Sequence, residues 1–300
     1  MTATLDTRGR DNAEVLACGG GAPEVHRIFA MGTLRIEGPQ GPITGDWLEQ
    51  RPGQLLRFLV CERRHIVPAD VIGEAIWPHA GPAAPNTVRH FVHALRERLE
   101  PGRSARTLTS AVVCRRGGYG LDGERVWVDA DEFEAQASMG AAALEMGRTS
   151  LARAHLERVV ALYAGDFLSD EPYAVWAMCE RERLRAIACD ALRSLVDMGA
   201  RSPEEEARWL ERLAALEPFD EDVHRELISA WLRMGRWSRA ARLYESFRAR
   251  LLREFGALPE FELATELFLF VLEPGVAAQS VDRSMLRRSH EPGARVIRNA

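Results

Sequence analysis

The sequence PNTVRHFVHALRERL, residues 85–99, decides how the N-terminal part of this chain folds. On a helical wheel with about 100° per residue, its apolar residues form one stripe that faces a core. The stripe consists of Val88, Phe91, Val92, Leu95 and Leu99. The other side carries Arg89, His90, His93, Arg96 and Glu97, with Arg98 at the boundary. The stretch therefore predicts an amphipathic helix, capped by Asn86 or Thr87, with a largely basic exposed face.

A short basic hairpin is expected sixteen residues after this helix. The segment Arg115-Arg116-Gly117-Gly118-Tyr119 separates two apolar stretches, Thr107–Cys114 and Tyr119–Val128, which are typical of strands. Gly117 and Gly118 predict a tight turn between them. Arg115 and Arg116 place two cations at the tip, and arginine is favoured in a narrow minor groove of DNA.

Two more helices are predicted upstream. Residues 54–62 place Leu55, Leu56, Leu59 and Val60 on one side, and residues 68–77 place Val71, Ile72, Ala75 and Ile76 together. Residues 28–37 read as short strands before them. The order of strand, three helices and hairpin is that of a winged helix-turn-helix, here expected over residues 28–128.

A basic helix next to a basic hairpin predicts binding to duplex DNA. Taken alone, the helix is explained more simply by a solvated face and the hairpin by a surface turn, but their combination in this order favours DNA. The expected contacts are Arg89, His90, His93, Arg96, Arg98, Arg115, Arg116, Gly117 and Tyr119. Arg51, Arg63 and Arg64 are further candidates for phosphate contacts, with an ordinary surface role as the equal alternative.

The rest of the chain predicts helices separated by short, glycine-containing connections. The expected helices cover residues 131–146, 149–164, 172–198, 203–216, 220–234, 237–254 and 260–272. The similar junctions Met146–Ala154 and Met234–Ala241 indicate a tetratricopeptide-like repeat. The fold class is therefore mainly α with a small β portion, in which an all-α domain over 129–273 follows the winged helix.

Charge is unevenly distributed along the chain. The net charge is −5, yet residues 28–128 hold thirteen arginines against ten acidic residues, whereas residues 129–300 hold 23 against 30. A DNA-facing module attached to an acidic module fits this asymmetry. All 39 basic residues are arginine, which excludes a standard P-loop because that loop needs a lysine.

Other classes of protein and site are not indicated by the sequence. Five scattered cysteines, no apolar run long enough for a membrane span and no secretory pattern favour a cytoplasmic protein. Residues 1–27 are expected to be a disordered leader and residues 274–300 a disordered tail. His90 and His93 are spaced like a metal-binding pair, but no other ligands accompany them. We expect no metal, no cofactor and no enzymatic activity.

Several blocks of the sequence make a known family apparent. In the first part these are Phe29–Ile36, Arg64–Trp77, Asn86–Arg96 and Arg116–Tyr119. In the second they are Asp131–Phe133, Leu162–Leu168, Arg181–Leu184 and Glu217–Pro259. Over residues 28–273 the chain resembles the actinobacterial antibiotic regulatory proteins, which join a response-regulator-type winged helix to a bacterial transcriptional activator domain. Family members often have histidine at the position of Phe91 and arginine at that of Ala94, which implies a different DNA target here.

The resemblance implies a sequence-specific transcriptional activator that binds direct repeats near a promoter −35 element as a homodimer and recruits RNA polymerase with its sigma factor. It also implies that the loop from Trp77 to Pro85, with Pro78, His79 and Pro82, faces the polymerase. The alternative from the residues alone is a helical-repeat adaptor whose winged helix binds protein. Neither reading places the protein in a membrane.

Overall fold

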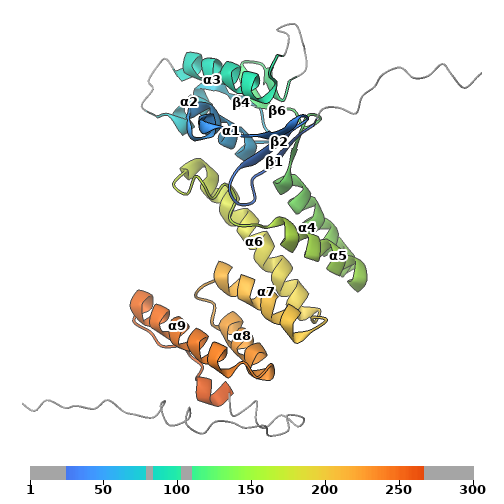
Figure 1. Ribbon diagram of the computed structural model, residues 1–300, viewed down its shortest axis with the longest axis vertical. Helices are drawn as coiled ribbons and strands as arrows, with labels where there is room; N and C mark the ends of the chain where they lie inside the picture. Colours follow the sequence, from blue (N-terminus) through green and yellow to red (C-terminus); the bar gives the residue numbers. More distant parts are fainter. Residues whose placement is uncertain (1–24, 79–83, 103–109, 267–300) are drawn as a thin grey trace, which may run out of the picture. The chain divides into compact units, whose positions relative to one another are not determined.

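The computed structural model describes residues 25–78, 84–102 and 110–266 and divides into two compact units (Figure 1). The first unit holds the described residues up to Glu134 together with Leu162–Leu184. The second holds Ala135–Ala161 and the described residues from Arg185 onward. The expected boundary after residue 128 differs from this division, because two pieces of the helical part pack with the winged helix.

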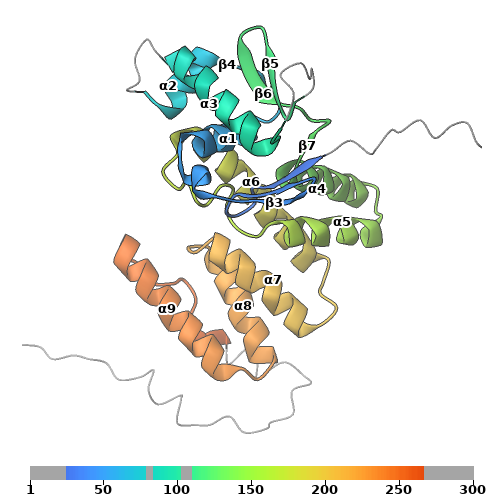
Figure 2. The same ribbon diagram turned by 45° about the horizontal axis from the view of Figure 1, so that its top comes forward.

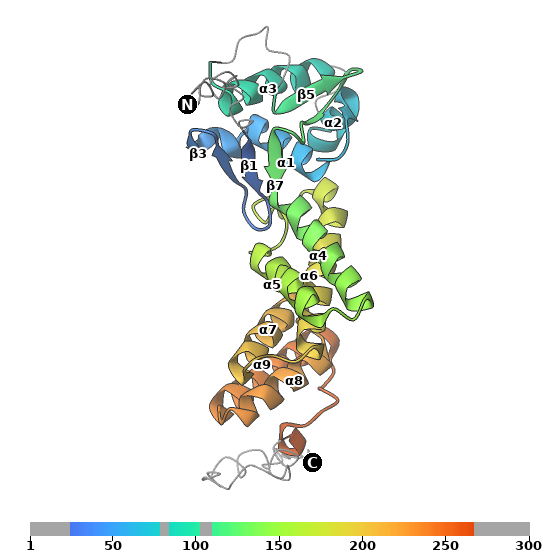
Figure 3. The ribbon, with the colours of Figure 1, turned by 90° about the vertical axis from the view of Figure 1, so that its right-hand side faces the viewer.

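The first unit contains two small sheets. One has the strand order β3-β2-β1-β7, formed by Gly41–Ile43, Arg35–Gly38, His26–Phe29 and Val126–Val128. In it β7 runs parallel to β1, with Ile28 opposite Val128 (Figure 3). The other has the order β4-β6-β5, formed by Val67–Pro68, Gly118–Leu121 and Val112–Arg115. The predicted strand Tyr119–Val128 is therefore two strands, β6 and β7, which belong to different sheets. Because β1 begins at His26, the expected leader ends before residue 27.

Three helices make the core of this unit. They are α1 (Arg51–Cys61), α2 (Ala69–Ile76) and α3 (Ala84–Leu99), preceded by the short 3-10 helix η1 (Asp46–Glu49). The predicted apolar faces of α1 and α3 are confirmed, since Leu55, Leu59, Val88, Val92 and Leu95 are almost completely buried. For α2 the prediction is partly wrong: Ile72 is buried, but Val71 and Ala75 are exposed.

Two glycines, which have no side chain, allow the hairpin to pack closely against strand β4. A Cβ atom on Gly118 would lie 2.8 Å from the carbonyl oxygen of Val67, and one on Gly120 would lie 2.6 Å from that of His65. Real Cβ atoms do not approach backbone oxygens so closely. Gly118 and Gly120 therefore let the segment after α1 lie directly against β6, which places the hairpin beside the helical core.

The helical part of the chain is tied to the winged helix by backbone contacts within the first unit. The buried carboxylate of Asp129, at the start of α4 (Asp129–Glu145), accepts hydrogen bonds from the N–H groups of Ala30 (2.8 Å) and Met31 (3.1 Å). Burial raises the pKa of Asp129, although these hydrogen bonds oppose the shift. Phe167 forms β-bridges with Met31 and Gly32. These contacts join segments that are more than 95 residues apart in the chain.

The second unit is helical. Its helices are the remainder of α4, α5 (Thr149–Leu162) up to Ala161, the end of α6 (Val175–Asp197), α7 (Pro203–Leu216), α8 (Glu221–Arg233) and α9 (Trp237–Phe255). Consecutive contacts of α7 with α8 and of α8 with α9 give the expected repeat-like stacking (Figure 1). Only the first turn of the helix predicted at 260–272 falls within the described residues. No helix in the described ranges is long and apolar enough to span a membrane.

A histidine is buried in the second unit. The ring of His224 stacks on Phe247 at 4.0 Å, and its Nδ1 lies 2.7 Å from the carbonyl oxygen of Asp220. Burial lowers the pKa of His224 below its usual 6.5. The folded state therefore prefers the neutral ring, and stability is lost as the pH falls below about 6.5.

We expect the free energy of unfolding of this unit to decrease between about pH 7.5 and about pH 5.5. The variant His224→Gln should show a smaller decrease over that window, because its amide does not titrate. Urea titrations at both pH values, followed by amide hydrogen exchange of α8 and α9, measure the difference. An identical pH dependence in the variant would contradict this role of His224.

Candidate nucleic-acid interface

Helix α3 presents three strips of side chains around its exposed side. His93 and Glu97 lie along the middle, roughly opposite the buried Val88, and their side chains are 73% and 69% exposed. Arg89 and Arg96, seven residues apart, lie along one edge. His90, Ala94 and Arg98 lie along the other edge, four residues apart. Of these, only Ala94 and Arg96 are partly buried, so the helix carries its predicted basic face into solvent.

Arg96 holds the hairpin onto α3. Its Nε and Nη2 atoms donate hydrogen bonds of 3.1 and 2.8 Å to the carbonyl oxygen of Val112, the first residue of β5. This contact identifies the edge of α3 that faces the hairpin, and it leaves Arg96 half-buried. The predicted role of Arg96 as a base reader therefore has a structural alternative, which is to position the hairpin.

The other edge of α3 borders a pocket beside the start of α1. This pocket of about 390 Å³ is lined by Trp47, Gln50, Arg51, Pro52, His90, Phe91, Ala94 and Arg98. The guanidinium of Arg51 lies 5.8 Å from the ring centres of both Trp77 and Phe91. One border of α3 thus carries the positive or protonatable side chains of Arg51, His90 and Arg98. The small side chain of Ala94 leaves the space between them.

The hairpin tip differs in detail from the prediction. Arg116 and Gly117 occupy the turn with φ values of 50° and 79°, whereas Gly118 already belongs to β6. Two successive positive φ angles are typical of the tight turns that join twisted strands. Arg115, Arg116 and Gly117 are exposed. The β5–β6 hairpin that carries them is drawn in Figure 2. Tyr119 is only 7% exposed, so its burial favours packing in the hairpin over contact with a ligand.

The segment expected to face the polymerase is described only at its beginning. Trp77 donates from Nε1 to Oε1 of Gln54 (3.1 Å), and its ring centre lies 5.1 Å from that of Phe91. Trp77 is thus packed against α1 and α3, and Pro78 after it is exposed. His79 and Pro82 lie outside the described residues.

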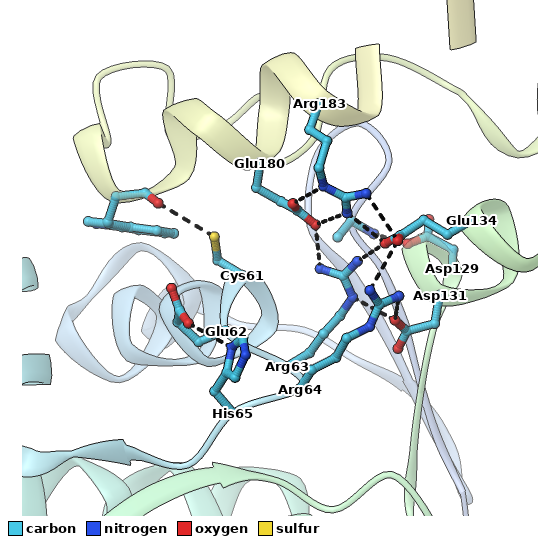
Figure 4. A network of polar contacts seen from close by, with 12 residues as sticks. Cys61, Glu62, Arg63, Arg64, His65, Asp129, Asp131, Glu134, Glu180 and Arg183 are labelled. Carbon is cyan, nitrogen blue, oxygen red and sulfur yellow. Dashed lines mark hydrogen bonds and ion pairs between the residues drawn. The ribbon is translucent and has the colours of Figure 1, made fainter. Parts of the chain in front are cut away.

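Arg63 is not a phosphate contact, because its side chain is 4% exposed and surrounded by carboxylates (Figure 4). Its Nε donates to Oδ1 of Asp131 and its Nη1 to Oε1 of Glu180, both at 2.8 Å, and its Nη2 pairs with Glu134. The neighbouring Arg64 also pairs with Asp131 (3.0 Å) and Glu134 (3.1 Å), although its side chain is 54% exposed. Both arginines therefore bind the start of α4, and Arg63 also binds α6.

Two acidic members of this network, Glu134 and Glu180, favour the ionised form. Burial would raise the pKa of Glu134 and of Glu180, but hydrogen bonds from Arg183 and the charge of Arg63 outweigh burial and lower both pKa values. Arg183 donates to Glu180 at 2.8 Å from its Nε and Nη2. The pKa of Arg183 is raised in return by these hydrogen bonds. Removing one charge from such a network leaves its buried partners uncompensated, which is strongly destabilising.

A second buried cation ties the winged helix to the segment before α6. The side chain of Arg57 in α1 is 2% exposed, and its Nε donates to Oδ2 of Asp170 at 2.8 Å. It also donates to the carbonyl oxygen of Leu48. Sequence reasoning missed Arg57 and Asp170. An arginine between the apolar residues of a predicted core helix was the available signal for a buried ion pair.

No group of three or more His, Cys, Asp and Glu side chains that could hold a metal ion occurs among the described residues. His90 and His93 stand on different strips of α3. Nε2 of His93 lies 3.4 Å from Oε1 of Glu97. The chemistry that the exposed side of α3 can perform is therefore hydrogen bonding and ion pairing.

Comparisons with family models agree with this architecture. Residues 47–121 match the model described as "Transcriptional regulatory protein, C terminal". Residues 128–267 match the "Bacterial transcriptional activator domain". The two matches follow each other in the predicted order, which confirms the winged helix and the helical activator domain.

Curated relatives are regulatory proteins. The chain is 26% identical over 223 residues to the regulatory protein DnrI of Streptomyces peucetius, covering 72% of this chain and 82% of DnrI. It is 28% identical over 221 residues to the transcriptional regulatory protein MoaR1 of Mycobacterium tuberculosis, covering 68% and 67%. The regulatory protein AfsR of Streptomyces coelicolor is 28% identical over 214 residues, but the match spans only 20% of its length. These relatives are thus regulatory proteins, of which MoaR1 is named as a transcriptional regulator.

A solved structure has a similar fold. The structure of Mycobacterium tuberculosis EmbR in complex with a low affinity phosphopeptide aligns with 83% of this chain at a TM-score of 0.55 and 21% sequence identity. The alignment spans 65% of the EmbR chain. This similarity shows a shared fold.

Proposed function

We propose that this chain, whose two matched domains resemble those of the actinobacterial antibiotic regulatory proteins, binds duplex DNA in a sequence-specific manner through α3 and the β5–β6 hairpin. Arg89 and its neighbours on the exposed side of α3 face base edges in the major groove. Arg115 and Arg116 contact the backbone or the adjacent minor groove. Arginine is suited to both tasks, since its planar guanidinium binds guanine and phosphate in a bidentate manner.

One observation carries this proposal. The exposed basic side of α3 and the cationic hairpin tip belong to the same compact unit, and Arg96 fixes one to the other through Val112. Because these two cationic elements are already held together, binding to one duplex does not cost conformational entropy to arrange them. Arg63, although basic, is excluded from the surface by its carboxylate partners.

The hairpin supports a first test. Replacing both Arg115 and Arg116 with glutamine should weaken binding to all sequences about equally, because phosphate contacts carry no sequence information. The slope of log K against log salt should become less steep by roughly 1.8, or about 0.9 for each lost phosphate contact. Fluorescence anisotropy at several salt concentrations, with a duplex that the full chain selects from a random pool, measures both effects.

A matched control separates this effect from the loss of net charge. Arg148 is exposed in the turn between α4 and α5 of the second unit, and Arg148→Gln should leave the salt slope unchanged. An unchanged slope in the hairpin variant would remove the hairpin from the interface. Failure of the full chain to bind any duplex at low salt, with retained binding to a protein partner, would favour the adaptor alternative.

We further propose that the protein is an activator that binds direct repeats near a −35 element as a homodimer and recruits RNA polymerase with its sigma factor. Trp77 is packed against α1 and α3, and this packing supports the proposal by fixing the residue at which the polymerase-facing loop would begin. In vitro transcription from a promoter that carries selected repeats should increase with the protein. It should lose this increase when one repeat is removed.

A further inference from the structure

Glu97 occupies the outermost position of the surface that α3 would present to DNA. It lies opposite the buried Val88 and has a side chain that is 69% exposed. A carboxylate on such a surface is repelled by phosphates. It also meets mostly acceptors on the base edges, namely N7, guanine O6 and thymine O4. Glu97 therefore weakens binding to any sequence that offers it no hydrogen-bond donor.

The neighbour one turn earlier orients this carboxylate. Nε2 of His93 lies 3.4 Å from Oε1 of Glu97, and the side chain of His93 is 73% exposed. Because the pair lies on one strip of the same helix, His93 restrains the carboxylate on the middle of the exposed side. The second oxygen of Glu97 remains available to accept a hydrogen bond.

Major-groove donors are few, which makes the partner of Glu97 specific. The base edges offer N–H groups only at cytosine N4 and adenine N6. Adenine presents the acceptor N7 beside its donor, so an amide matches it better than a carboxylate does. Cytosine presents its amino group without that repulsion.

We propose that Glu97 selects a cytosine in the DNA target and that His93 is its positioning residue. This inference rests on the proposed function and deepens it by naming one base of the target. It also explains how a chain with alanine at position 94 keeps selectivity: the carboxylate penalises wrong bases in addition to rewarding the correct one.

Parallel selection from a random duplex pool tests the inference with the full chain. The wild-type protein should prefer cytosine at one position of each repeat by roughly tenfold to a hundredfold. Glu97→Ala should lose this preference, keep the others and bind non-selected DNA more tightly. Glu97→Gln should shift the preference to adenine, which glutamine binds through N6 and N7. Glu145→Gln removes the same charge from an exposed position on α4 and should leave the base preferences unchanged.

His93 needs a readout that a merely structural role would not change. His93→Leu should reduce the cytosine preference without changing the other positions, and His93→Gln should restore it because an amide can still donate to Glu97. An unaltered base preference in Glu97→Ala overturns the inference while the proposed function stands. Absence of any selected sequence with the wild-type chain overturns the proposed function itself.

Discussion

Replacing Arg63 with methionine is expected to lower the free energy of unfolding of the first unit by about 3–5 kcal/mol. The substitution keeps much of the side-chain volume but removes the cation among Asp131, Glu134 and Glu180. Their carboxylates would then be partly buried with only Arg64 and Arg183 to compensate for them. Urea denaturation of the full chain, with amide hydrogen exchange to assign the change to α1 and α4, measures this loss.

The adjacent residue provides the control. Arg64 pairs with two of the same carboxylates, but its side chain is 54% exposed, and exposed ion pairs contribute about 0–1 kcal/mol. Arg64→Met should therefore have a small effect. Equal free energies of unfolding for Arg63→Met and Arg64→Met would show that the burial of Arg63 adds nothing to its contribution to stability. Faster exchange in α8 would instead indicate a global effect.

Changing Arg89 to glutamine is expected to have the largest effect on DNA recognition. Arg89 is exposed on the edge of α3 next to the hairpin, where a bidentate contact to guanine contributes roughly 1–3 kcal/mol. Affinity for the selected duplex should fall roughly 5- to 150-fold, with a much smaller loss for unrelated DNA. The ratio of the two dissociation constants, measured by anisotropy at one salt concentration, reports the loss of specificity.

Arg148→Gln again serves as the control, because it removes an exposed arginine from the second unit. A uniform loss of affinity across all sequences in Arg89→Gln would assign Arg89 to the phosphate backbone. The hairpin variant is expected to behave in that uniform way, so the two variants together separate base reading from positioning.

Periodicity was sufficient to predict α1 and α3, because each has enough turns for an apolar stripe to define one buried face. The eight-residue helix α2 is too short for this, and its apolar residues did not reveal that Val71 and Ala75 point to solvent. Turn chemistry was similarly ambiguous in the hairpin. Arg116-Gly117-Gly118 allows two registers, and only the close packing of Gly118 against Val67 selects one.

The environment of the arginines could not be predicted from local sequence. Arg63 looked like a surface cation, but its partners Asp131 and Glu180 are 68 and 117 residues away in the chain. Arg96 fitted the basic face, yet its guanidinium contacts the backbone of Val112. Tyr119 was expected at the interface because it is next to the basic turn, although its side chain is buried like the rest of β6.

The central claim is that α3 and the β5–β6 hairpin together bind DNA. The most direct test is the affinity of the full-length triple variant Arg89→Gln, Arg115→Gln, Arg116→Gln for the selected duplex, with its unfolding midpoint measured in parallel. We expect an unchanged midpoint, since all three side chains are exposed, a lower affinity for all DNA, and a preference for the selected duplex over random DNA that is roughly 5- to 150-fold smaller than in the wild type. Wild-type affinity for the selected duplex in this folded variant would contradict the account.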